Sequence, residues 1–235
     1  MQGVVPAAGE GTRLRPLTAD KPKGMVEVAG KPLLTHVFET LLDAGVTEFV
    51  VVVGYEMDSI VAHYGDEFRG VPVTYVHQRE QEGLAHAVLQ AEAHVDGQFV
   101  VLNGDNVFGD GIGAAVERAA EPDVNAALLV EEVTPEAARE TGVVEVEEGR
   151  VTGLVEKPDE PPSRLVTTGC YVLPAEVFEA CRLLRPSERG EYELSDAVGV
   201  LVRAGATVEP VRYDGRRCNV NAPEDVERAT ELLEE

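Results

Sequence analysis

The chain opens with residues 1–34, MQGVVPAAGEGTRLRPLTADKPKGMVEVAGKPLL, and this stretch decides the fold that we expect. The apolar run at residues 3–6 predicts the first buried strand of an α/β sheet. The loop that follows, residues 7–13, is made of small residues, so its backbone can approach a ligand and its N–H groups can form an anion nest. Arg13 ends this loop with a planar guanidinium group that suits phosphate oxygens. We therefore expect a polyphosphate-binding loop directly after the first strand.

Lysine is rare in this chain, and each lysine neighbours a proline. The lysines are Lys21, Lys23, Lys31 and Lys157, and subtracting these four from the 20 basic residues leaves 16 arginines. We interpret Lys23 and Lys157 as functional. For Lys21 and Lys31 a phosphate contact and an ordinary turn lysine remain equally open.

The length and the charge limit the function classes. A chain of 235 residues forms one large domain or two small ones. Its 20 basic and 43 acidic residues give a net charge of −23, which excludes a general binder of nucleic acid or of anionic membranes. Because 44% of the residues are hydrophobic, disorder does not explain this charge. We expect a salt-adapted protein, since molar salt shortens the Debye length to about 3 Å and screens the self-repulsion.

The cysteines and the hydropathy indicate the compartment. Cys170, Cys181 and Cys218 form no CxxC pair, so we expect reduced thiols rather than disulfides or a zinc site. We expect no signal peptide, because the chain starts with the first strand, and no apolar run approaches the ~20 residues that span a bilayer. We therefore expect a cytoplasmic protein without a membrane or nucleic-acid partner, and a homo-oligomer stays possible.

The hydrophobic pattern of the first half predicts a βαβ series and hence a mainly parallel sheet. The run EFVVVV at residues 48–53 is typical of a strand that is covered on both faces. Strands are predicted at residues 3–6, 48–53, 71–76, 99–102, 126–130, 165–172 and 207–211. Helices are predicted at residues 35–44, 57–64, 83–93, 113–120, 174–184, 194–203 and 222–233.

Asp105 follows the buried run FVVL at residues 99–102, within the sequence Asn103-Gly104-Asp105. A carboxylate at the carboxyl end of a strand suits Mg²⁺, which takes one or two carboxylates and completes its six ligands with water and phosphate oxygens. The alternative is an aspartate in a β-turn before Gly109. We favour the metal site.

The hydrophobic pattern changes at Gly142. From there, apolar residues alternate with period two around a turn at Gly149. This pattern predicts an antiparallel hairpin. The hairpin ends in Glu156-Lys157, and a proline-rich loop follows. The alternative is a surface hairpin that carries a simple ion pair.

These motifs together resemble those of the sugar-1-phosphate nucleotidylyltransferases, the group of glucose-1-phosphate thymidylyl- and uridylyltransferases. The segments GEGTRLRPLT and KPKGMVEVAGKPLL resemble the signature of this family, and the resemblance extends over nearly the whole chain. It implies a three-layer, Rossmann-like α/β fold with a mixed, mainly parallel sheet, flanking helices and a small antiparallel lid. We expect one domain over residues 1–235, with nucleotide bound by about residues 1–130, sugar phosphate bound by about 131–235, and no C-terminal hexapeptide repeats.

The resemblance also implies an activity: transfer of a nucleotidyl group from an NTP to a sugar-1-phosphate, with release of pyrophosphate. UTP or dTTP and glucose-1-phosphate are the favoured substrates. The catalytic residues would be Arg13 and Lys23. The nucleotide would be bound by Ala8, Gly9, Gly11, Thr12, Arg13, Gln78 and Gly83.

The second half of the chain would bind the other substrate. The residues that match the sugar-phosphate site of the family are Gly142, Glu156, Lys157 and Thr168. Residues 189–196, RGEYELSD, resemble a family segment that we expect to order the loops around the sugar, without a catalytic role. Mg²⁺ would be held by Asp105 and Asn219.

The chain departs from the family pattern at the second metal ligand. The usual form there is Trp-x-Asp-x-Gly, whereas this chain has Asn219 at the Asp position, Asn221 at the Gly position and no tryptophan. An amide oxygen can bind Mg²⁺ but brings one less negative charge. Two alternatives stay open: the same fold acting on GTP, CTP or ATP with another phosphorylated acceptor, and a catalytically weak sensor of nucleotide sugars.

Overall fold

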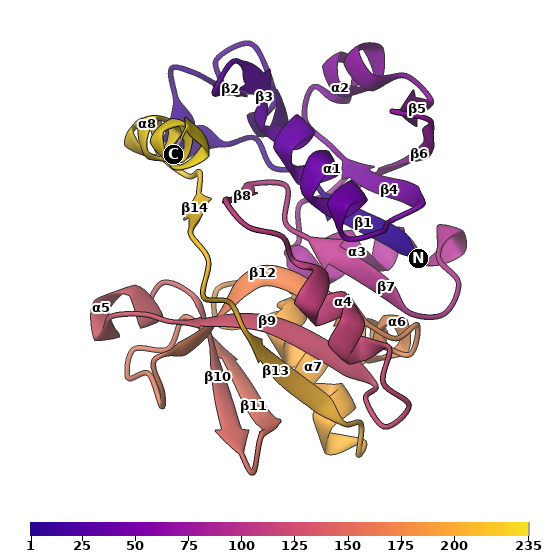
Figure 1. Cartoon of the computed structure of the whole chain (residues 1–235), viewed down its shortest axis with the longest axis vertical. Coiled ribbons are helices and arrows are strands. Elements are labelled where there is room, and N and C mark those ends of the chain that lie inside the picture. The colour runs from indigo at the N-terminus through magenta and orange to yellow at the C-terminus, as the bar shows by residue number, and fades with distance from the viewer. Residues whose placement is uncertain (235) are drawn as a thin grey trace.

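The computed structural model describes residues 1–234, with strands running through the middle of the molecule and helices around them (Figure 1). Its strands are β1 (Gln2–Pro6), β2 (Glu27–Val28), β3 (Lys31–Pro32), β4 (Glu48–Val53), β5 (Glu67–Phe68), β6 (Val71–His77), β7 (Phe99–Leu102), β8 (Asn106–Phe108), β9 (Ala126–Glu132), β10 (Gly142–Glu147), β11 (Arg150–Glu156), β12 (Leu165–Leu173), β13 (Val208–Arg212) and β14 (Arg217–Asn219). Its α-helices are α1 (Leu33–Asp43), α2 (Met57–Tyr64), α3 (Leu84–Gln90), α4 (Gly113–Ala119), α5 (Pro135–Ala138), α6 (Val177–Leu183), α7 (Leu194–Arg203) and α8 (Pro223–Glu234). Short 3-10 turns are η1 (Thr12–Leu14), η2 (Lys23–Met25) and η3 (Glu92–His94).

The centre of the sheet consists of four parallel strands in the order β7-β1-β4-β6. Strand β12 runs antiparallel to β7 and also pairs with β9 and β10, so the sheet branches there. The pairing of β12 with β9 shifts register between Thr167 and Tyr171, around Gly169, whose φ is +81°. The mixed sheet with its parallel centre and flanking helices confirms the predicted fold class.

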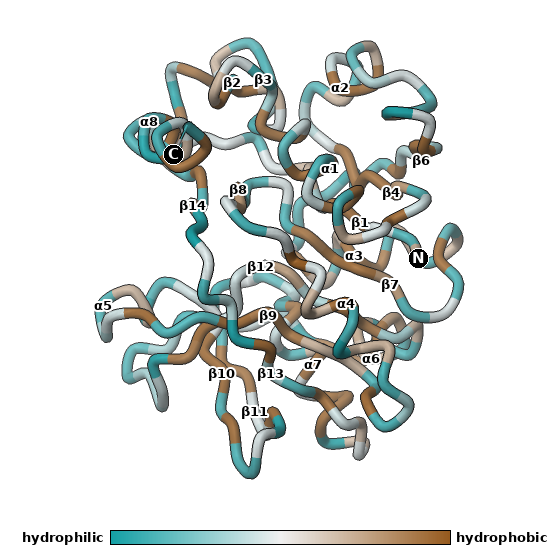
Figure 2. The backbone as a smooth tube through the Cα atoms, in the orientation of Figure 1, coloured by the Kyte–Doolittle hydropathy of each residue, from teal (hydrophilic) through white to brown (hydrophobic). Residues whose placement is uncertain are grey.

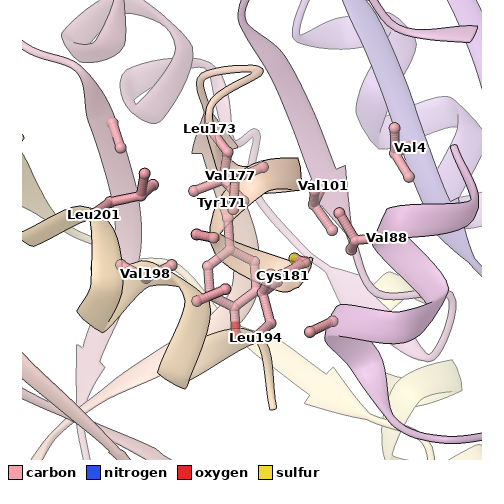
Figure 3. Close-up of a cluster of buried hydrophobic side chains, with 14 of the residues drawn as sticks. Val4, Val88, Val101, Tyr171, Leu173, Val177, Cys181, Leu194, Val198 and Leu201 are labelled. Atoms are coloured by element: carbon pink, nitrogen blue, oxygen red, sulfur yellow. The ribbon is translucent and has the colours of Figure 1, made fainter. Parts of the chain in front are cut away.

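Alternate residues of the buried strands pack on opposite faces of the sheet, as the period of two in a strand requires. Val4 and Val101 belong to the cluster beneath α3, α6 and α7, where Val88 joins them (Figure 3). Val5 belongs to the cluster beneath α1, α2 and α4. Figure 2 shows the hydrophobic colour concentrated on central strands such as β7. Helices therefore cover both faces, and both faces of the central strands are apolar.

The predicted antiparallel hairpin is formed by β10 and β11. Its turn residues Glu148 and Gly149 have φ values of +50° and +80°, which is the geometry of a tight hairpin turn. Val143 of β10 packs with Val166 and Ala138 in a small separate cluster. The hairpin thus extends the branched part of the sheet, where Figure 1 shows it projecting from the body of the molecule.

Two predicted helices are shorter than their hydrophobic pattern indicates. The helix predicted over residues 83–93 ends at Gln90, because the N–H groups of Ala91 and His94 bond three residues back, to Val88 and Ala91, and tighten the chain into a 3-10 turn. The helix predicted over residues 174–184 begins at Val177 after a similar turn.

The three cysteines are free and buried, as the scattered spacing predicted. Among residues 1–234 no helix is both long and apolar enough to cross a bilayer.

Candidate active site

The carboxyl ends of β1 and β7 place two of the predicted motifs side by side. These strands are parallel neighbours, so the loop after Pro6 meets the segment after Leu102. The N–H of Gly104 donates to the carbonyl of Pro6 at 3.1 Å, and a Cβ at residue 104 would lie 2.7 Å from that oxygen. Glycine at 104 therefore allows the close approach that brings Asp105 to the phosphate loop.

Lys23 lies at the centre of this site. Its Nζ is 2.7 Å from Oδ2 of Asp105 and 2.8 Å from Oδ1 of Asn221. Arg13 donates through Nη2 to the same Asn221 oxygen at 3.2 Å. The side chains of Lys23 and Asp105 are 15% and 25% exposed, so a ligand can still reach them. The structure thus brings Arg13, Lys23 and Asp105 together and adds Asn221, which the sequence analysis had placed at a glycine position without a role.

Gly11 determines how closely the phosphate loop packs on Lys23. Its φ is +67°, and a Cβ there would lie 2.9 Å from the Cβ of Lys23. The hydroxyl of Thr18 donates to the carbonyl of Gly11 at 2.8 Å and holds the turn. Gly9 has open space beside its Cα, as close approach of a ligand to the backbone requires. The geometry of this loop thus explains why both positions are occupied by glycine.

The remaining loop residues line or support a cavity of about 450 Å³. Thr12 starts η1 and lines this cavity. Ala8 is buried, and its carbonyl accepts from Nε2 of Gln81 at 2.9 Å. Gln81 lines the same cavity and was missed in the sequence, because a glutamine in a polar loop carries no pattern.

The loop after β14 carries Asn219 and Asn221. Oδ2 of Asp225 accepts the N–H groups of Asn221 at 2.8 Å and of Ala222 at 2.7 Å, so this buried carboxylate holds the loop. Burial raises the pKa of Asp225, but the bonds from Asn221, Arg228 and Ala222 outweigh burial and leave the pKa lowered. Within residues 1–234 it is the amide of Asn221, not that of Asn219, that contacts Lys23.

A larger cavity of about 690 Å³ connects this cluster to the hairpin. It contains all of the predicted sugar-phosphate residues together with the predicted metal ligands: Gly142, Glu156, Lys157, Thr168, Asp105 and Asn219. Residues from both halves of the chain therefore share one cavity.

Gly142 and Glu156 are paired across the hairpin. A Cβ at residue 142 would lie 3.0 Å from Oε2 of Glu156, so glycine leaves room for this carboxylate. Lys157 has a φ of +42°, and its side chain makes no hydrogen bond or ion pair within residues 1–234. The hydroxyl of Thr168 donates to the carbonyl of Leu129 at 3.0 Å. Lys157 is thus a cation of this cavity that has no ion-pair partner within the described residues.

The surroundings of Glu156 shift the pKa of its carboxyl group. Burial raises its pKa above the ordinary glutamate range, the charge of Glu193 raises it further, and Lys157 and Arg189 pull it back only in part. The hydroxyl of Ser195 donates to Oε2 at 3.3 Å.

The predicted base-reading residues lie at the start of α3. Gly83 has a φ of +111°, and a Cβ there would lie 2.6 Å from the carbonyl oxygen of Tyr192. Gln78 is buried, with Nε2 3.1 Å from Nδ1 of His86 and 3.5 Å from the carbonyl of Gly83. In this structure the Gln78 amide therefore supports the loop.

Two buried polar atoms in this region have no hydrogen-bond partner among the described residues: Oδ1 of Asn103 and Nε of Arg217. Both residues line the larger cavity, and Nη1 of Arg217 donates to Asn106 at 3.0 Å. The sequence analysis missed both. The available signals were the position of Asn103 beside Gly104-Asp105 and the basic residue two positions before Asn219.

The oxygen pair of Asp105 and Asn221 suits a cation, because the Lys23 ammonium already lies between these oxygens. Residues 1–234 contain no cluster of three or more His, Cys, Asp or Glu side chains that could hold a metal. A Mg²⁺ ion therefore needs substrate phosphate oxygens and water to complete its ligands.

The fold and the site define an α/β protein that presents a loop of small residues and a polar cavity at the carboxyl ends of parallel strands. A family model described as nucleotidyl transferase matches residues 2–216, and the chain belongs to this family. It is 53% identical over 236 residues to UTP–glucose-1-phosphate uridylyltransferase AglF of Haloferax volcanii, covering 100% of this chain and 97% of that protein.

Solved structures agree with this assignment. A crystal structure of UDP-glucose pyrophosphorylase complexed with UDP-glucose matches with a TM-score of 0.89 and 25% identity, over 99% of this chain and 98% of that chain. A UTP-bound UGPase from Acinetobacter baumannii matches with a TM-score of 0.81 and 26% identity, over 98% of this chain and 92% of that chain. These similarities confirm the predicted family and fold.

Proposed function

We propose that this protein transfers a uridylyl group from UTP to glucose-1-phosphate and releases pyrophosphate, with dTTP as the alternative nucleotide. The observation that carries the proposal is the position of Lys23, which lines the smaller cavity between Asp105 and Asn221, the two partners that line both cavities. One cavity contains the phosphate loop, and the other contains Glu156 and Lys157. The identity to the Haloferax uridylyltransferase supports the choice of UTP and glucose-1-phosphate.

The proposed chemistry is attack of a sugar-phosphate oxygen on the α-phosphorus, in line with the departing pyrophosphate. Such transfer depends on positioning and on neutralising charge more than on covalent steps. Arg13 holds the β- and γ-phosphates, and Lys23 stabilises the charge that builds up between the α-phosphate and the sugar phosphate. Lys157 binds the sugar phosphate.

The sugar and base would be bound by the other predicted residues. Glu156 accepts hydrogen bonds from sugar hydroxyls, and Gly142 lets the ring approach the backbone. Gln78 and Gly83 would contact the base. The part formed by about residues 1–130 then serves the nucleotide, and the part formed by about 131–235 serves the sugar phosphate.

Asp105 and an amide oxygen from Asn219 or Asn221 would hold Mg²⁺. When bound, the ion neutralises phosphate charge and polarises the α-phosphorus. Because the protein supplies one carboxylate at this position, we expect metal to bind much more tightly in the presence of the nucleotide.

The test is pyrophosphate release in molar KCl with Mg²⁺, with UTP, dTTP, CTP, GTP and ATP crossed against the 1-phosphates of glucose, galactose, mannose and N-acetylglucosamine. The proposal predicts release with UTP or dTTP only when glucose-1-phosphate is present. Release with a purine nucleotide, with CTP or with another sugar would overturn the substrate assignment.

No release in any combination, with UDP-glucose still bound, would favour a sensor of nucleotide sugars. In that case Asn219→Asp should restore turnover if the missing carboxylate is the cause.

A further inference from the structure

Residues 187–195, which run from the loop after α6 into the first turn of α7, contact both proposed substrate subsites. This 187–195 segment contains most of the RGEYELSD motif, for which the sequence predicted only an ordering role. The contacts at its two ends are of different kinds. Backbone groups reach the base loop, and side chains reach the sugar carboxylate.

The base-loop contact is made by the backbone of Tyr192. Its N–H donates to the carbonyl of Glu82 at 2.7 Å, and its carbonyl accepts the N–H of Ala85 at 2.9 Å. Between these two bonds, Gly83 packs so closely that a Cβ would lie 2.6 Å from the Tyr192 oxygen. The segment is thus fixed by backbone hydrogen bonds to the loop that carries the proposed base-binding residues.

The sugar-side contact is a group of charged side chains around Glu156. Nη1 of Arg189 lies 3.7 Å from Oε1 of Glu156 and 3.7 Å from Oε1 of Glu193. Glu193 is only 7% exposed, and its Oε1 accepts from the hydroxyl of Ser187 at 3.1 Å. Nη2 of Arg189 also lies 3.6 Å from Oε1 of Glu191, whose side chain is 44% exposed. One guanidinium group is therefore shared by three carboxylates, and Glu193 is the least exposed of the three.

We infer that Glu193 is a positioning residue, which holds Arg189 away from full pairing with Glu156 and so keeps the Glu156 carboxylate available to sugar hydroxyls. Without the buried carboxylate of Glu193 to fix it, the guanidinium would be free to turn and make its fork-shaped, two-bond contact with Glu156. The lone pairs of the Glu156 carboxylate, which would accept hydrogen bonds from the sugar hydroxyls, would then be occupied by Arg189. This inference rests on the function proposed above, which makes Glu156 the ligand of the sugar.

A second consequence follows from the backbone contact. Substitution of the Glu193 side chain leaves the Tyr192 hydrogen bonds to the base loop intact. The loss should therefore fall on the sugar phosphate and not on the nucleotide. A merely structural role would weaken both substrates together.

The experiment compares Glu193→Gln with Glu188→Gln, which removes the same charge from an exposed residue of the same segment. For Glu193→Gln we expect the KM for glucose-1-phosphate to rise on the order of tenfold, while the KM for UTP stays within about twofold. Glu188→Gln should leave both constants unchanged. An unchanged KM for glucose-1-phosphate, or an equal rise of both KM values, would overturn the inference.

Arg189→Ala provides a second variant in case Glu193→Gln does not fold, because it removes the guanidinium group that Glu193 is inferred to hold away from Glu156. With that group gone, the KM for glucose-1-phosphate should stay within about twofold of the wild-type value, and a rise on the order of tenfold would contradict the positioning role. Calorimetric titration of glucose-1-phosphate into each protein separates the two proposals. Absence of wild-type turnover would contradict the proposed function, whereas equal affinity of the wild type and Glu193→Gln would contradict only this inference.

Discussion

Lys23 and Asp105 are 82 residues apart in the chain, and their charged groups lie 2.7 Å apart across the mouth of the site. The ammonium also reaches Asn221, so one lysine joins the phosphate loop, the end of β7 and the loop before α8. Under the proposed function, this cation would stabilise the phosphate charge that develops during transfer. This geometry makes Lys23 the first residue to test.

Lys23→Met should lower kcat on the order of 10²–10³-fold, because it removes a preorganised charge from the transition state. The matched control is Lys31→Met, since Lys31 is 49% exposed and pairs with Glu39 at the surface. Steady-state pyrophosphate release measures both. Full turnover of Lys23→Met would show that the phosphate role is wrong.

Asn221→Ala should raise the Mg²⁺ concentration needed for half-maximal activity on the order of tenfold, because its oxygen faces the Asp105 carboxylate across Lys23. Asn219→Ala should raise it less, since the amide of Asn219 does not contact Lys23 within the described residues. Titration with Mg²⁺ at saturating substrates compares the variants. The opposite order would return the metal-ligand role to Asn219.

Gly142→Ala should raise the KM for glucose-1-phosphate several-fold to about tenfold, because small displacements at a binding site are costly. The new Cβ would lie 3.0 Å from Oε2 of Glu156 and 3.2 Å from Oγ1 of Thr167, so the carboxylate must move. Gly113→Ala is the control, because no atom lies within 4 Å of a Cβ there. Equal KM values for the two variants would argue against a role of Glu156 in sugar binding.

The KM for glucose-1-phosphate should rise as the pH falls, starting at a pH above the ordinary glutamate range. Burial and the charge of Glu193 raise the pKa of Glu156 against the opposing charges of Lys157 and Arg189, and only the ionised carboxylate is a pure acceptor.

The contribution of Glu156 to folding stability changes with pH in the opposite direction to its contribution to sugar binding. A raised folded-state pKa stabilises the fold at low pH, below the unfolded pKa, and this contribution is lost as the pH rises through the folded value. Glu156→Gln should remove the part of the pH dependence of the KM that lies above the ordinary glutamate range. A profile of that KM identical to the wild-type profile would assign the titration to another group.

The unfolding midpoint should rise by several degrees between 0.1 M and 2 M KCl. A net charge of −23 repels itself at low salt, and a gain of 1 kcal/mol shifts the midpoint of a chain of this size by about 2–4 °C. Thermal melts followed by circular dichroism measure the shift, which should be largest below about 1 M, where screening changes most. A midpoint that does not depend on salt would contradict the salt-adapted interpretation.

Most strands and helices were predictable because their signals are local. Strand β4, helix α2 and helix α7 occupy the predicted residues without change, since each is defined by a short hydrophobic period between glycine or polar boundaries. Helices α3 and α6 were predicted too long. Their 3-10 turns depend on individual hydrogen bonds, which hydrophobic spacing does not encode.

Local pattern was also sufficient to select residues 7–13, Asp105 and the Glu156-Lys157 pair as candidates, because loop chemistry and strand ends are properties of neighbouring residues. Tertiary packing determines which side chains from distant parts of the chain come into contact. Asn221 reaches Lys23 from 198 positions away because α8 and β14 pack against the first loops. Contacts of this kind arise when distant segments bury a shared apolar surface, and no short stretch of sequence specifies which partner it will meet.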